Sequence, residues 1–259
     1  MKKKILLISF STLLTAILIL VIFLISDKKE MESLRSKPIR LPADFTYTAH
    51  TGCIDTKDNS LEAIEAGTKS GADIVELDLN FLPDGTAVLA HDEPKGNETT
   101  LDEAFRKVSE YENLKVNVDA KSVANLKVVY PLAKKHGIEK RIFYTGIELK
   151  DVEAVKKDSP EVPYYLNCNV KKPKKQTPEY LQELVEEVKG CGAVGINFNK
   201  DSATKELVDV FHENGLLVSI WTVNEEKDMY KILQLSPDNI TTRRPDKMQE
   251  ILKQNKKAE

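Results

Sequence analysis

The stretch IVELDLNFLPDGTAVLAH, residues 74–91, decides the fold of this protein. It holds two apolar runs of the kind that form buried strands, and only residues 80–86 separate them. Consecutive parallel strands need a crossover of about a dozen residues or more, so these two runs cannot form such a pair. Pro-Asp-Gly at 83–85 is instead typical of a tight turn. The stretch therefore predicts an antiparallel hairpin.

The rest of the chain alternates strand-like runs with helix-like segments. Several of the helix-like segments begin after Ser, Thr, Asp or Asn and end at Gly, as helices commonly do. Alternation of this kind over about 215 residues is typical of a parallel sheet with helical crossovers. The strand-like runs outside the hairpin lie at 46–50, 115–120, 141–146, 163–167, 193–199, 216–223 and 239–242.

The number of strands selects one parallel architecture. With the two hairpin runs there are nine strand-like runs, and setting aside the return strand of the hairpin leaves eight. Eight parallel strands, each followed by a helix, form the (β/α)8 TIM barrel. An open doubly wound sheet is the alternative, and no P-loop fingerprint G-x-x-x-x-G-K-[ST] supports it. We therefore expect an α/β TIM barrel with a β-hairpin after its second strand.

Residues 1–26 have the composition of a membrane anchor. MKKK leads to Ile5–Ile25, 21 residues without a charge, and a helix of that length spans about 30 Å, enough for one bilayer core. A cleaved signal peptide is the alternative, but the apolar run exceeds the usual signal core and no A-x-A-like cleavage site follows it. We therefore expect one N-terminal transmembrane helix in 1–26, a charged tether in 27–43 and the TIM-barrel domain in 44–259.

The charge distribution predicts an orientation and excludes one class of partner. Three lysines precede the apolar run, which favours a cytoplasmic N-terminus and an extracytoplasmic main domain in a single-pass protein of the cell membrane. Residues 1–26 contain three of the chain's 38 Lys and Arg and none of its 41 Asp and Glu, so the remainder is acidic. An acidic domain argues against nucleic acid as a partner. The sequence leaves the oligomeric state open.

Polar residues stand at the ends of consecutive strand-like runs, where the active site of a TIM barrel lies. His50 ends the first run. Glu76 and Asp78 are two residues apart in the second run, so their side chains face the same side of the strand. Asp119 and Lys121 end the next barrel strand with the same spacing. We therefore expect these five side chains to converge on one site.

The hairpin brings a second histidine, His91, towards this site. If Asp84-Gly85 forms a two-residue loop, His91 lies opposite Asp78, at the Cβ spacing of about 4.5–5.5 Å that cross-strand pairs have. A bulge in the turn would shift this pairing by one residue. The predicted register therefore depends on the turn.

These six side chains together fit the chemistry of a phosphodiester. The three carboxylates provide hard oxygen ligands for one divalent cation, Mg²⁺ or Ca²⁺. Two histidines beside such a cation can act as general acid and base. A lysine next to it can hold a phosphate group. The combination predicts metal-assisted cleavage of a phosphodiester.

The order of these motifs resembles the glycerophosphodiester phosphodiesterase family. That family has a His-Arg-Gly start, a Glu-Asn-Thr helix cap, a GAD-x-x-E-x-D strand, a DG…HD hairpin, a Glu-x-Lys strand, a WTVN strand and a terminal ITD-x-P segment. The resemblance covers roughly residues 46–250. The corresponding segments here are AHTG (49–52), DNSLEAI (58–64), GADIVELDL (71–79), PDGTAVLAHDE (83–93), VDAK (118–121), WTVN (221–224) and ITTRRPD (240–246).

The resemblance implies a hydrolase that cleaves a glycerophosphodiester or a related phospholipid-derived diester with one bound divalent cation. Together with the predicted anchor, it implies a small-molecule or lipid-derived substrate at or near the bilayer. By position it implies metal binding by Glu76, Asp78 and Asp119, acid–base catalysis by His50 and His91, phosphate contact by Lys121, and an apolar wall formed by Trp221.

Three departures from the family pattern leave alternatives open. The arginine after the first histidine is Thr51 here, which removes a bidentate phosphate contact. Two family glutamates are Asp58 and Asp119, and Asp-x-Lys at the second place also resembles sphingomyelinase D-type phosphodiesterases or lyases. The segment after the hairpin is short, so we expect an open pocket. Loss of the arginine also fits a membrane-anchored barrel that is catalytically inactive or has an altered specificity.

Overall fold

The computed structural model describes residues 2–256, with side chains described for residues 13–255. The chain divides into two compact units, one up to Ile39 and one from Arg40 on. Each unit is described by itself.

The first unit contains one long helix, α1 (Lys2–Arg35). Its large apolar side chains between residues 13 and 25 are exposed. The helix continues beyond them, so the predicted tether is helical over residues 27–35. Where side chains are described, no helix is long and apolar enough to cross a membrane, and residues 5–12 of the predicted anchor lie outside that part. The predicted transmembrane helix is therefore not supported by the described residues.

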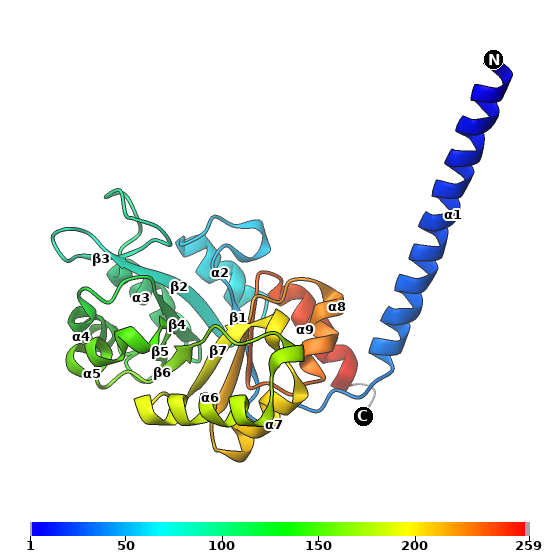
Figure 1. Ribbon diagram of the computed structural model, residues 1–259. Coiled ribbons are helices and arrows are strands. Elements are labelled where there is room, and N and C mark those ends of the chain that lie inside the picture. The colour runs from blue at the N-terminus through cyan, green and yellow to red at the C-terminus, as the bar shows by residue number, and fades with distance from the viewer. Residues whose placement is uncertain (1, 257–259) are drawn as a thin grey trace. The chain divides into compact units, whose positions relative to one another are not determined.

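The second unit is a closed barrel of eight parallel strands, which confirms the predicted TIM barrel (Figure 1). Each barrel strand pairs with its neighbours in the order of the chain, and β1 pairs with both β2 and β9, which closes the sheet. The barrel strands are β1 (Thr46–Ala49), β2 (Ile74–Phe81), β4 (Lys115–Ala120), β5 (Ile142–Ile147), β6 (Tyr164–Asn167), β7 (Gly195–Asn199), β8 (Leu217–Trp221) and β9 (Asn239–Thr242).

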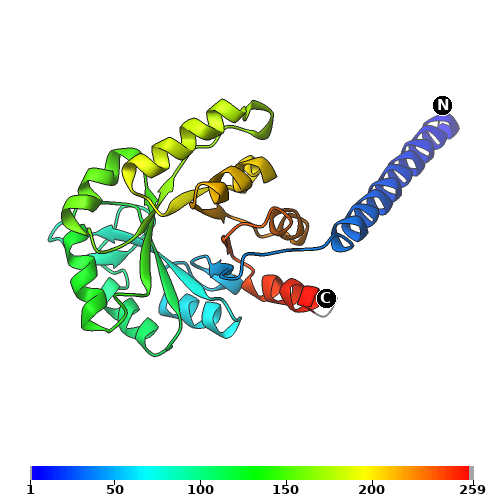
Figure 2. The same ribbon diagram turned by 90° about the horizontal axis from the view of Figure 1, so that it is seen from below.

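Figure 2 shows the helices of this unit arranged around the strands. Local sequence sets several helix starts: Ser60, Thr177 and Thr204 each accept a hydrogen bond from the backbone of the first turn. The α-helices are α2 (Leu61–Lys69), α3 (Leu101–Ser109), α4 (Val129–Lys135), α5 (Val152–Asp158), α6 (Pro178–Cys191), α7 (Lys205–Glu213), α8 (Glu226–Leu233) and α9 (Pro245–Lys256). Short 3-10 helices are η1 (Cys53–Asp55), η2 (Leu126–Val128), η3 (Leu149–Asp151), η4 (Pro173–Lys175) and η5 (Lys200–Ser202).

The segment GCGAVG at 190–195 has the spacing G-x-G-x-x-G. It joins the end of α6 to β7, whereas a dinucleotide-binding turn joins the end of a strand to a helix. Gly195 also packs against the neighbouring strand, where an added Cβ would lie 2.1 Å from the carbonyl oxygen of Leu217. This segment is therefore a helix-to-strand connection and gives no support to an open nucleotide-binding sheet.

The two faces of β2 differ in polarity. Leu77 and Leu79 alternate with Glu76 and Asp78, and all four are buried. The acids line a cavity at the mouth of the barrel, so the leucines face the surrounding helices. The polar face continues on β4, where Asn117 Nδ2 donates a hydrogen bond to Glu76 Oε2 (3.1 Å). The barrel interior near its mouth is thus polar and hydrogen-bonded, while the apolar core lies between strands and helices.

The predicted hairpin is present, but its register differs by one residue. Strand β3 (Ala87–Leu89) runs antiparallel to β2, with Leu79 paired to Leu89. The loop has three residues, because Leu82 N donates to Thr86 O (2.9 Å) and Gly85 takes a φ of 86°. A left-handed glycine at this place is typical of a three-residue hairpin loop with a bulge. The prediction that His91 lies opposite Asp78 is therefore wrong.

Candidate active site

All seven predicted site residues line one cavity of about 670 Å³ at the carboxyl ends of the barrel strands. His50 and Lys121 directly follow β1 and β4, and the other residues come from β2, β4, β8 and the segment after β3. The parallel strands place these positions together, because their carboxyl ends meet at one end of the barrel. The structure therefore brings together what the sequence distributes over more than 170 residues.

The three carboxylates form a compact cluster. One oxygen from each of Glu76, Asp78 and Asp119 lies within 4.8 Å of the others. Thr145 Oγ1 donates to Asp119 Oδ1 (2.9 Å). Gly146 allows the backbone of β5 to approach this group, since an added Cβ would lie 2.7 Å from Asp119 Oδ1. The cluster is thus held in place from β2, β4 and β5.

The charge of the cluster is only partly balanced. Lys121 Nζ lies 3.2 Å from Asp78 Oδ1 and also hydrogen-bonds Asp119. Burial opposes the charged form of Lys121, yet Asp119 and Asp78 raise its pKa above the ordinary value. Burial, then Asp119 and Asp78, raise the pKa of Glu76 well above that of a free carboxyl. Three converging acids beside one lysine fit a divalent cation, which would offset the remaining negative charge.

His50 stands directly beside the carboxylates. Its Nε2 lies 3.6 Å from Glu76 Oε1, and its Nδ1 lies 2.9 Å from the carbonyl oxygen of Thr51. The carbonyl can only accept, so Nδ1 carries the proton and donates it. Burial lowers the pKa of His50. The imidazole is therefore neutral near pH 7, with the lone pair of Nε2 directed into the site.

His91 lies at the exposed rim of the same cavity. Its side chain is 68% exposed, and its Nδ1 lies 2.9 Å from Asp92 Oδ1. The shifted register explains the position: Ala90 N donates to Asp78 O (3.0 Å), so Ala90 and not His91 lies opposite Asp78. His91 is therefore in the pocket but outside the buried cluster.

Thr51 has a structural role that the sequence does not reveal. The residue is 3% exposed, and its Oγ1 accepts a hydrogen bond from Asn59 N (2.5 Å). Asn59 in turn donates from Nδ2 to Asp78 Oδ2 (2.9 Å), and Asn59 Oδ1 accepts from Asp78 N (3.1 Å). The hydroxyl thus fixes Asn59, which fixes one carboxylate of the cluster.

Arg243 is a pocket residue that sequence reasoning missed. It comes directly after β9, and its guanidinium makes a two-point contact with Asp58, from Nη1 to Oδ1 (2.7 Å) and from Nη2 to Oδ2 (3.1 Å). Asp58 also lines the cavity. Two arginines directly after the last strand of a barrel were the available signal, because that place is the carboxyl end of a strand.

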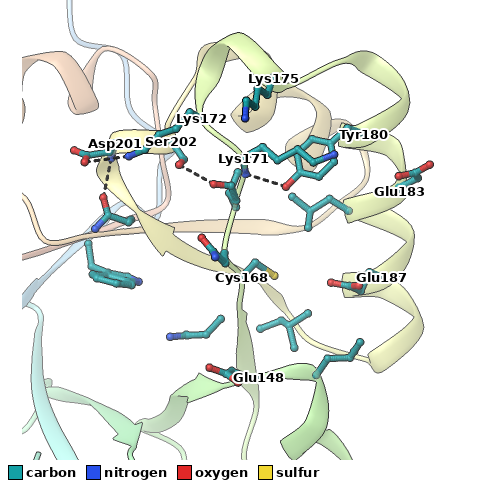
Figure 3. A pocket seen from close by; sticks show the side chains of 18 of the residues that line it. Glu148, Cys168, Lys171, Lys172, Lys175, Tyr180, Glu183, Glu187, Asp201 and Ser202 are labelled. Carbon is teal, nitrogen blue, oxygen red and sulfur yellow. Dashed lines mark hydrogen bonds and ion pairs between the residues drawn. The ribbon is translucent and has the colours of Figure 1, made fainter.

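A second cavity of about 1090 Å³ adjoins the first. The two share Glu148, Lys150, Asn167 and Trp221. Figure 3 shows this second cavity, with lysines of the loop before α6 at one end and acidic residues of α6 along its side. The indole Nε1–H of Trp221 is buried and has no acceptor among the described residues. Trp221 therefore lies in the wall that the candidate active site shares with a larger cavity lined by both acidic and basic side chains.

The chain also matches proteins of known family. The model of the glycerophosphoryl diester phosphodiesterase family matches residues 42–117 and 94–247. The chain belongs to this family. This confirms the resemblance predicted from the sequence, and the protein is a phosphodiesterase, a phosphoric diester hydrolase.

Two curated members of the glycerophosphodiester phosphodiesterases are similar along most of their length. One from Bacillus altitudinis is 29% identical over 231 residues, which covers 77% of this chain and 94% of that protein. One from Caldanaerobacter subterraneus is 27% identical over 237 residues, with 76% and 93% covered. The solved structure of an Oleispira antarctica phosphodiesterase, in complex with the product sn-glycerol-3-phosphate, superposes with a TM-score of 0.64 at 16% identity, with 82% and 97% covered.

Proposed function

We propose that this phosphodiesterase hydrolyses a glycerophosphodiester with the help of one divalent cation bound by Glu76, Asp78 and Asp119. The observation that carries the proposal is the convergence of three carboxylates, a histidine and a lysine in one cavity. The product named for the Oleispira antarctica relative, sn-glycerol-3-phosphate, supports a glycerol phosphate as one half of the substrate.

The residues of this chain have separate tasks in the proposed reaction. The bound cation supplies positive charge against the phosphate. His50 accepts the proton of the attacking hydroxyl at Nε2, since its Nδ1–H is already committed to a backbone carbonyl. His91 protonates the leaving alkoxide from the open rim, with Asp92 orienting its ring. Lys121 holds a non-bridging phosphate oxygen.

The attacking hydroxyl belongs either to water or to the substrate itself. Water gives a phosphomonoester and an alcohol, whereas a neighbouring hydroxyl of the substrate gives a cyclic phosphate. Phosphorus NMR of the products separates the two routes. For the alcohol, we propose the adjoining cavity beyond Trp221, because it opens from the phosphate site and is large enough for a headgroup.

The cation proposed for the site is Mg²⁺ or Ca²⁺, because all three ligands are carboxylates. Calorimetric titration of the protein with each ion, after treatment with EDTA, distinguishes the two. Binding of Zn²⁺ in preference to both would contradict the assignment.

We propose further that residues 1–26 attach the protein to the cell membrane with the barrel on the extracytoplasmic side. The support is the sequence, with its 21 uncharged residues from Ile5 to Ile25 after three lysines. Extraction of membranes with alkaline carbonate tests the attachment, and protease added to intact cells tests the orientation. Release of the full-length chain by carbonate would contradict the proposed attachment to the membrane.

The activity itself is tested with glycerophosphocholine and bis-p-nitrophenyl phosphate, with EDTA and then with each cation restored. Wild-type protein is expected to cleave at least one diester in a cation-dependent manner, and His50→Ala to lose this activity. If the two proteins show the same negligible rate on every diester, the barrel is a binding domain instead. Choline release from sphingomyelin or lysophosphatidylcholine would favour the sphingomyelinase D-type alternative.

A further inference from the structure

We infer that Arg243 binds a non-bridging oxygen of the substrate phosphate and takes the place of the arginine that the family has after its first histidine. This inference rests on the proposed phosphodiesterase site. The family position of that arginine is Thr51 in this chain, at the end of β1. Arg243 reaches the same cavity from the end of β9, the strand that pairs with β1.

The guanidinium is fixed in direction and has donors to spare. Asp58 engages Nη1 and Nη2, and Nη1 also lies 3.5 Å from the carbonyl oxygen of Gly52. Within the described part of the chain, the Nε–H and the second hydrogen of Nη2 have no acceptor. The Arg243 side chain is 38% exposed, so an anion can reach it from the cavity. An arginine oriented by a carboxylate is well suited to a phosphate oxygen.

The loop that follows β1 leaves room for the ion pair between Asp58 and Arg243. An added Cβ on Gly52 would lie 1.7 Å from Asp58 Oδ1 and 2.7 Å from Arg243 Nη1. Gly52 also has a φ of 68°, a conformation that a residue with a side chain adopts at a cost. The glycine thus leaves the space that the Asp58–Arg243 pair occupies.

Thr51 cannot supply the missing contact. Its hydroxyl is buried and already bonded to Asn59, on the side of the cluster. The guanidinium of Arg243 therefore reaches the same cavity from β9, the strand next to β1, where Thr51 holds the position of the family arginine.

The order of the strands places two positively charged side chains on either side of His50 and the β2 carboxylates. Neighbouring strands run β9, β1, β2, β4, with Arg243 after the first and Lys121 after the last. His50 and the β2 carboxylates come from the two strands between them. A phosphate above β1 and β2 would therefore face Lys121 on one side and Arg243 on the other, which matches a doubly charged product.

The test measures anion binding without turnover. The chain has a single tryptophan, Trp221, and it lines the cavity, so its fluorescence reports ligand in the site. Full-length protein with Mg²⁺ is titrated with sn-glycerol 3-phosphate. Arg243→Ala and Arg243→Gln are expected to weaken the affinity about ten- to a hundredfold, the usual loss of a charged hydrogen-bond donor. Arg243→Lys keeps the charge without the two-point geometry and should recover only part of it.

Arg244→Gln is the matched control. Arg244 is the next residue and is also paired with a carboxylate, Asp246, but it does not line the cavity. Its substitution should leave the affinity within about twofold of wild type. Thermal unfolding of each variant separates a binding defect from a folding defect. The Arg243→Gln variant keeps a side chain that can donate a hydrogen bond to Asp58.

Each outcome decides the inference. Folded Arg243 variants that bind sn-glycerol 3-phosphate as tightly as wild type overturn it, even if the enzyme is active. Wild-type protein that binds no anion at millimolar concentration overturns it as well. Binding that depends on Arg243 without cleavage of any diester would support the anion site and contradict only the catalytic proposal.

Discussion

Asp78 on β2 is paired in register with Asp119 on β4, so the two carboxylates stand side by side on adjacent parallel strands. Like charges at this spacing repel each other, and Lys121 lies close to both. A cluster held together in this way depends on added positive charge.

Replacement of Asp119 by Asn should remove the metal site with little change in fold. We expect Mg²⁺ to raise the melting temperature of wild type but not of Asp119→Asn, because ligand binding to the folded state stabilises it. Diester cleavage should fall by at least about a hundredfold. Asp209→Asn on α7, a half-exposed carboxylate far from the cluster in the fold, serves as control and should keep both responses. If Mg²⁺ raised the melting temperature of both variants equally, Asp119 would not be a metal ligand.

The pH dependence of stability should report the buried state of Glu76. Burial, with Asp119 and Asp78, raises its pKa in the folded protein, so the folded state binds this proton more tightly than the unfolded state. The contribution of the protonated Glu76 to stability is fully present below the ordinary carboxyl pKa of about 4.3. It is lost as pH rises through the pKa that Glu76 has in the folded protein. In EDTA, Glu76→Gln should therefore be more stable than wild type at neutral and alkaline pH, and the difference should shrink in acid.

Urea unfolding at a series of pH values measures this difference. Added Mg²⁺ should restore the stability of wild type and leave Glu76→Gln nearly unchanged. A Glu76→Gln variant less stable than wild type throughout would show that the carboxylate is ionised and satisfied without a metal.

The stability of Lys121→Met should depend on Mg²⁺ more than that of wild type, whereas the stability of Asp119→Asn should not respond to it. Without divalent cations, loss of the ammonium leaves Asp78 and Asp119 unbalanced, and we expect a loss of about 2 kcal/mol in unfolding free energy, less than for a fully buried pair because Lys121 is partly exposed. Saturating Mg²⁺ should recover much of this loss but not the activity. Lys150→Met is the control: it lines the same cavity, but its side chain is 73% exposed and its partner is Glu148. Its stability should change by less than about 0.5 kcal/mol.

Thr51 should tolerate serine but neither valine nor arginine. Thr51→Val keeps the volume but leaves Asn59 N without its acceptor, which should cost about 1–2 kcal/mol and loosen Asp78. Thr51→Ser should retain the bond. Thr51→Arg restores the family residue in the sequence, yet it inserts a long side chain at a position only 3% exposed, so we expect lower stability and no gain in activity. Higher activity of Thr51→Arg would contradict the structural role.

Much of the fold and of the site could be predicted because the signals are local. The short connection between β2 and β3 excludes a crossover, and the i, i+2 spacing of Glu76 and Asp78 fixes a common face. The three-residue loop could not be predicted, since Gly85 has a positive φ in a two-residue Asp-Gly loop as well as in a three-residue loop. That choice moved His91 from the strand to the rim.

The sequence by itself determined the parallel barrel, the converging carboxylates and the family, because these follow from strand periodicity, connection lengths and motifs in order. Only the tertiary structure decided what Thr51 and Arg243 do. Their partners, Asn59 and Asp58, are eight and 185 residues away, and closure of β9 onto β1 brings the second pair together. A contact between the first and last strands of a barrel produces no periodic pattern in the sequence. It can therefore be recognised only once the strands are in place.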